Sequence, residues 1–66
     1  MAMLKVIEVL AESKKSWEDA AQEAVATAAK TVRGIRSINV KNLQATVDKG
    51  KITSYRLNAK ISFGLE

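Results

Sequence analysis

The apolar positions of the first half of the chain change from a dense run to a helical repeat. Residues 5–10 are mostly apolar and β-branched, which is typical of a short strand. Residues 17–33 are rich in alanine, and their apolar positions recur every three or four residues, which predicts a helix. Ser16 and Asp19 open it as a capping box, in which the serine hydroxyl accepts from the Asp19 amide and the Asp19 carboxylate reaches back. Basic residues followed by Gly34 predict the helix end.

The second half of the chain has apolar positions at every second residue. Residues 35–47 predict a strand whose apolar phase reverses midway, and a bulge near residues 41–42 reconciles the two phases. Residues 48–50, Asp-Lys-Gly, predict a hairpin turn. The last strand, residues 55–65, alternates apolar and polar positions throughout.

These elements predict an α+β fold of βαββ type, a single domain over residues 1–66. A right-handed crossover leaves the first two strands parallel, and the hairpin makes the third strand antiparallel to the second. The third strand therefore lies in the middle, giving a three-stranded antiparallel sheet of order 1-3-2 packed on one helix. The helix contact face is alanine-rich, so the helix axis can lie close to the sheet. One sheet face and two sheet edges stay uncovered, and partners are expected there.

Chain length makes self-assembly the expected route to stability. A domain of ~60 residues buries only about 60% of its unfolded surface, and chains this short usually need disulfides, a metal or partner subunits. The sequence has no cysteine and no histidine, so partner subunits remain. There is no apolar run of the ~18 residues that a membrane span needs, and charged residues interrupt the N-terminal segment. We therefore expect a cytoplasmic protein without membrane contact.

Charge is divided unevenly along the chain. Residues 1–23 carry five acidic side chains and three lysines, whereas residues 24–65 carry eight lysines or arginines and one acid, Asp48. This asymmetry can indicate an anionic partner, but the solvated faces of a helix and a sheet are the usual explanation for scattered charges.

The side chains that usually carry out catalysis are scarce. Without histidine and cysteine, the common general base, the thiol nucleophile and the soft metal ligands are missing, so we expect no enzymatic activity and assign no metal ligand. The glycines are isolated and form no phosphate-binding loop. Trp17, Tyr55 and Phe63 lie on predicted apolar faces, so we interpret them as core or subunit-interface residues.

A row of polar side chains on the last strand is harder to assign to packing. These consecutive outward positions on a central strand need water or a partner, and they could line a cavity or a nucleic-acid groove. No exposed aromatic residues alternate with them, which argues against nucleic acid. We call this set the polar row: Arg56, Asn58, Lys60 and Ser62.

The order and spacing of four short motifs resemble those of the dodecins, small flavin-binding proteins of βαββ fold that assemble into hollow shells of twelve subunits. The motifs are Lys5-Val6-Ile7-Glu8, Ser16-Trp17-Glu18-Asp19-Ala20-Ala21, Thr31-Val32-Arg33 with Ile35-Arg36, and Tyr55-Arg56 through Ile61-Ser62-Phe63. The resemblance implies a homododecamer of cubic symmetry, with helices outside and sheets inside.

Two positions depart from the flavin-binding members that the chain resembles. In those members a tryptophan after the helix exit stacks on the isoalloxazine ring, and a glutamine in the last strand bonds to the flavin edge. The matching positions here are Ser37 and Arg56. Serine removes the aromatic platform, and arginine has no acceptor for the flavin edge but suits a phosphate or carboxylate. Binding of flavin, as FMN or riboflavin, is therefore in doubt.

Three hypotheses for function follow. The first is a dodecin-like shell that binds or sequesters a flavin or another small anionic ligand near Ser37 and Arg56. The second is a structural oligomer without a specific ligand, in which Arg56 and Lys60 form ion pairs with acidic residues of other subunits. The third is calcium held by carboxylates between subunits, which needs only oxygen ligands; the spacing of the glutamates does not favour it specifically.

Overall fold

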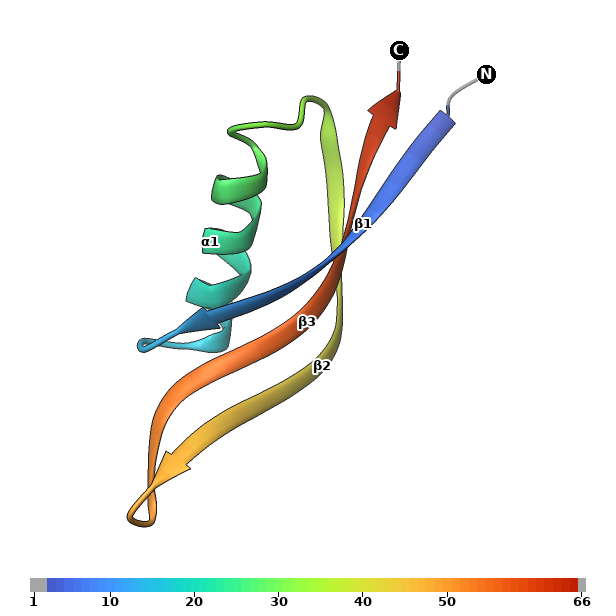
Figure 1. The fold of residues 1–66 in the computed structure, drawn as a ribbon. Coiled ribbons are helices and arrows are strands. Elements are labelled where there is room, and N and C mark those ends of the chain that lie inside the picture. The colour runs from blue at the N-terminus through green and yellow to red at the C-terminus, as the bar shows by residue number, and fades with distance from the viewer. Residues whose placement is uncertain (1–2, 66) are drawn as a thin grey trace.

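A computed structural model of the chain describes residues 3–65. Its elements follow the order β1 (Met3–Ser13), α1 (Trp17–Ala28), β2 (Ile35–Asp48) and β3 (Lys51–Leu65). The three strands form one antiparallel sheet of order β1-β3-β2, and α1 lies on one side of it (Figure 1). The predicted βαββ fold and strand order are confirmed.

The N-terminus of α1 forms where the capping motif predicts it. Ser16 is extended, with φ −171° and ψ 167°, and its Oγ accepts a hydrogen bond from the Asp19 amide at 3.0 Å. The Asp19 carboxylate has a different partner from the one predicted, because its Oδ2 accepts from the Ser13 hydroxyl at 2.7 Å. The cap therefore also ties the helix start to the last residue of β1.

The C-terminus of α1 is where the sequence prediction was wrong. The helix ends at Ala28, five residues before the predicted end at Arg33. The Lys30 and Thr31 amides bond to carbonyls three residues back, which tightens the backbone into a turn. Gly34 then adopts φ 74°, a left-handed conformation that suits glycine, and turns the chain into β2.

The hairpin and the bulge of β2 match the prediction. Lys49 and Gly50 have positive φ angles of 53° and 79°, as a tight two-residue turn between twisted strands requires. The register with β3 shifts between Val40 and Asn42, where the sequence predicts a bulge. Two further shifts, at Ile35/Ser37 and Thr46/Val47, were not predicted.

The core is small and is built largely from alanine. Ala20 on α1 and Ala59 on β3 are both completely buried, which confirms that the helix lies close to the sheet. Leu57 and Ile61 are the largest fully buried side chains among the described residues. Trp17 packs edge-on against Tyr55, with ring centroids 4.9 Å apart, and its Nε1 donates to the Gln44 carbonyl at 3.0 Å. The interpretation of Trp17 as a packing residue is confirmed.

The subunit is long and thin. Its principal extents are 51, 20 and 13 Å, and its radius of gyration is 13.5 Å, against ~11 Å for a compact domain of this length. Figure 1 shows the reason: the paired ends of β2 and β3 extend well past the N-terminal end of α1. The helix therefore covers only part of its own sheet.

Candidate functional site

The sheet face opposite α1, called here the helix-free face, is the surface on which the sequence places its candidate residues. Strand alternation and the pairing of β1, β2 and β3 put the polar row and Ser37 on this face. The row is less exposed than expected. Arg56, Asn58 and Ser62 are half-buried, and only Lys60 is fully exposed.

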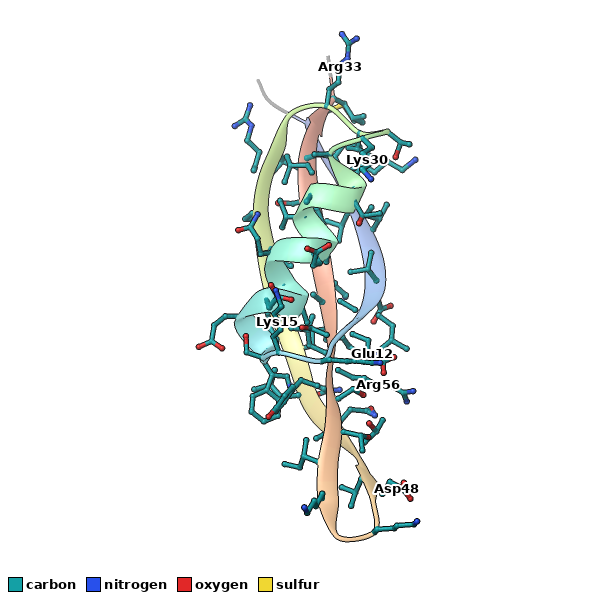
Figure 2. The ribbon with its side chains drawn as sticks, turned by 90° about the vertical axis from the view of Figure 1, so that its left-hand side faces the viewer. Glu12, Lys15, Lys30, Arg33, Asp48 and Arg56 are labelled. Carbon is teal, nitrogen blue, oxygen red and sulfur yellow. The ribbon has the colours of Figure 1, made fainter. Side chains whose placement is uncertain are left out.

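Arg56 is held by a carboxylate of its own subunit. Its Nε lies 3.3 Å from Glu12 Oε1, because β1 and β3 pair so that these two residues are directly opposite each other. Figure 2 shows the two side chains next to each other below the N-terminal half of the helix. Glu12 is therefore a partner of Arg56 within one chain.

Glu12 is held on both of its oxygens. Oε2 accepts a hydrogen bond of 2.7 Å from the hydroxyl of Ser54, which is only 4% exposed. This hydrogen bond, followed by the positive charge of Arg56, lowers the pKa of Glu12 below its usual value of 4.5. Hydroxyl contacts at 2.6 and 2.7 Å continue from Ser54 through Thr46 to Thr53. The result is a polar chain across all three strands.

Ser37 lies far from Arg56 within the subunit. It is opposite Ser62 and shares a hydroxyl–hydroxyl hydrogen bond with it. Ser62 is six residues along β3 from Arg56, a distance of roughly 20 Å at about 3.3 Å per residue. A single subunit therefore does not bring the two predicted site residues together. A ligand that contacts both positions needs at least two subunits.

A hollow at the exit of the helix is lined by positive charge. It has a volume of about 360 Å³ and lies between the helix exit and the end of β3. Arg33, Arg36 and Thr31 line it together with Phe63, and the Arg36 guanidinium extends over Gly64. Guanidinium groups bind phosphates and carboxylates in a planar, two-pronged way, so this hollow suits an anionic group.

Carboxylates do not gather into a metal site within one subunit. Among residues 3–65 there is no group of three or more acidic side chains placed to hold a metal ion. Calcium takes six to eight oxygen ligands, so a calcium site here would need backbone carbonyls, water or carboxylates of other subunits. The same residues include no helix long and apolar enough to cross a membrane.

Two features of the helix-free face were not predicted. The first is Glu12 as the partner of Arg56, which could have been found by placing the first strand antiparallel to the third and counting the register. The second is an apolar row on β1, called here the β1 row: Leu4, Val6 and Leu10, which are 53–64% exposed. Apolar residues of β1 occur on both faces of the strand, as in Val6-Ile7 and Val9-Leu10, so their alternation is hidden in the sequence.

Comparison with known proteins agrees with the fold and the motifs. Residues 3–66 match the sequence model of the family Dodecin. Calcium dodecin of Mycobacterium tuberculosis is 44% identical over 64 residues, which are 96% of this chain and 89% of that protein. Its crystal structure, described as having a novel calcium-binding site, has a TM-score of 0.83 and 40% identity over 97% of this chain and 91% of that one.

Other dodecins are less similar to this chain in sequence than calcium dodecin is, but their backbones superpose on it more closely. A variant of the dodecin from Thermus thermophilus has a TM-score of 0.94 and 29% identity, covering all of this chain and 97% of that one. The dodecin of Streptomyces coelicolor has a TM-score of 0.93 and 25% identity over 98% and 93% of the two chains. The family match over nearly all of the sequence, together with the shared βαββ backbone, shows that this chain belongs to the dodecin family.

Proposed function

We propose that this chain is one subunit of a homododecameric shell that binds a small ligand and does not catalyse a reaction. The observation that carries this proposal is the amount of apolar surface that one subunit leaves exposed. The β1 row lies on the helix-free face, and Val47 and Ile52 are 63% and 54% exposed at the hairpin. Exposed apolar patches are typical of interaction surfaces.

Subunit contacts also supply the stability that the small core lacks. Two fully buried large side chains are few for a domain without disulfides. Sedimentation velocity tests the assembly directly. We expect one species of about twelve times 7.2 kDa at micromolar concentration; a monomer under these conditions would contradict the proposal.

The proposed ligand is a small anionic molecule that lies between subunits near Ser37 and Arg56. The arginine-lined hollow at the helix exit supports the anionic character, and the separation of Ser37 from Arg56 supports a site shared by subunits. Flavin is the family's ligand, but Ser37 offers no aromatic ring to it. We therefore expect FMN, with its phosphate, to bind more tightly than riboflavin.

Flavin fluorescence tests this order of affinities. FMN and riboflavin are each titrated with the assembled protein, and quenching of their fluorescence reports binding. Tighter binding of FMN that weakens with rising salt supports an arginine-bound phosphate. Equal affinities for the two flavins would argue against an anion site, and no quenching of either would remove flavin from consideration.

Calcium is the second candidate ligand. It is favoured by one observation, namely that a relative 44% identical to this chain is a calcium dodecin. Within one subunit no acidic cluster is present among residues 3–65, so the proposed ion lies between subunits. Calorimetric titration of the EDTA-treated assembly with calcium, with magnesium as the control, tests this. Heat of binding for calcium alone supports the site, and no heat for either ion contradicts it.

A further inference from the structure

A groove of about 560 Å³ runs between α1 and the outer side of β1. β1 is an edge strand, so its outer edge is open to another chain. The floor of the groove is apolar and includes Ile7, Val9 and Ala24. Glu23 of α1 is an exposed carboxylate on its wall. The groove therefore suits a partner that combines apolar side chains with positive charge.

The hairpin of β2 and β3 has that combination. Val47 and Ile52 are directly opposite each other near its tip, and both are more than half exposed. Lys49 and Lys51 lie between them at the turn, and Asp48 offsets one of these two charges. Figure 2 shows Asp48 at the far end of the subunit, away from the side chains that surround the helix.

The hairpin cannot reach the groove of its own subunit. Its strands are paired from Asp48 and Lys51 onward, and they bend and extend past the N-terminal end of α1 (Figure 1). The groove lies at the β1 edge of the sheet, whereas β2 of the hairpin forms the other edge. The occupant that fits is therefore the hairpin of a second copy of the chain.

We propose that the hairpin tip of one subunit docks in the groove between α1 and β1 of the next. Val47 and Ile52 cover the apolar floor, and Lys49 and Lys51 face Glu23 of the receiving subunit. This inference rests on the proposed self-assembly and names the surfaces that make it. The contact joins two different surfaces, so its repetition forms a ring when the rotation from one copy to the next closes, as a closed shell requires.

Disulfide trapping tests the contact, and the native chain has no cysteine that could interfere. The test variant carries Ile52→Cys and Thr27→Cys, the second on the groove wall. The control variant carries Ile52→Cys and Val6→Cys, which places the second thiol on the helix-free face. A disulfide needs Cα atoms about 4.4–6.8 Å apart, and a short bismaleimide linker relaxes this requirement.

Docking predicts covalent dimers and larger rings from the test variant on a non-reducing gel, and few from the control. The protein could sediment as an assembly and yet cross-link only in the Val6 control, or in neither variant. That result would overturn the docking while the proposed assembly stands. Unmodified protein that sediments as a monomer would overturn both, so the two failures are distinguishable.

Charge reversal gives an independent readout. Glu23→Lys places like charges at the contact and should raise the dissociation constant of the assembly roughly tenfold. Adding Lys49→Glu and Lys51→Glu to Glu23→Lys should bring the dissociation constant back toward the native value. Gln22→Lys is the matched control, because it adds a lysine at an exposed helix position that does not line the groove. Equal weakening by Glu23→Lys and Gln22→Lys would contradict the proposed pairing.

Discussion

The Nε atom of Arg56 lies 3.3 Å from the Oε1 atom of Glu12, and this pair joins the middle strand of the sheet to β1 within a single subunit. Both side chains are substantially exposed, at 39% and 49%, so the ion pair itself contributes little to stability. Its main effect is on position: it directs the Arg56 side chain toward β1. A ligand near Arg56 would have to compete with Glu12 or accept a guanidinium already oriented by it.

Acid titration should destabilise the fold through Glu12. The Ser54 hydrogen bond and Arg56 lower the pKa of Glu12 in the folded chain below 4.5. Its contribution to stability is therefore present above about pH 4.5 and is lost as the pH falls through the lowered folded value. Urea unfolding from pH 6 to pH 3 should show this loss. Glu12→Gln should reduce the slope, and Ser54→Ala, which removes the hydrogen bond to the Glu12 carboxylate, should reduce it in part. An unchanged slope in Glu12→Gln would contradict the assignment.

Restoring the family's flavin residues should restore flavin affinity. Ser37→Trp with Arg56→Gln replaces the missing aromatic platform and supplies an amide with both a donor and an acceptor. An aromatic contact is worth about 0.5–1.5 kcal/mol beyond buried area, so affinity for riboflavin should rise roughly 2-fold to 12-fold for each ring that stacks. Fluorescence quenching measures it. Each single variant is a control, and a double variant no tighter than the native chain would contradict the assignment of these positions.

Enlarging Ala20 should push the helix away from the sheet. Ala20 is completely buried between α1 and the sheet, so Ala20→Leu overfills the layer and should cost about 1–3 kcal/mol of unfolding free energy. Ala26 lies on the exposed side of the same helix, and Ala26→Leu should change stability by less than ~0.5 kcal/mol. Urea unfolding followed by Trp17 fluorescence checks both. Equal effects would mean that the close approach of helix and sheet is not required.

Removing the helix cap should destabilise the start of α1. Ser16→Ala removes the oxygen that accepts from the Asp19 amide and should cost about 1 kcal/mol. Ser16→Asp retains an acceptor there and should preserve most of the stability. Thermal unfolding of the native chain and the two variants tests this. If Ser16→Asp loses as much stability as Ser16→Ala, the hydrogen-bond acceptor at this position is not what stabilises the helix start.

The parts of the fold that the sequence predicts well depend on local signals. The capping serine, the turn at residues 48–50 and the bulge near residues 41–42 each act within a few residues. The helix end at Ala28 was missed because the apolar repeat continues to Val32, which is half-buried although it lies beyond the helix. Local spacing cannot separate a helix from a tight turn that keeps the same side chain facing inward.

The candidate site was predicted only in part, because it depends on pairing between distant segments. Ser37 and Arg56 were chosen by resemblance, and the structure places both on one face but far apart. The Glu12 partner of Arg56 depends on a strand register between residues 44 positions apart along the chain. Whatever a second subunit adds to the site is set by assembly, which one chain's sequence does not describe.

The bulge between Val40 and Asn42 makes the length of β2 more important than its composition. Because the bulge absorbs one residue, Leu43 and Ala45 stay on the helix side of the sheet, in register with Leu57 and Tyr55. Without the bulge, regular alternation over the same residues would move both side chains to the opposite face, whereas deleting Lys41 would remove the bulge and leave the later pairs in register. Away from this bulge, a change of one residue in length would alter both surfaces of the sheet at once, so insertions and deletions should be rarer there than substitutions during the divergence of this family.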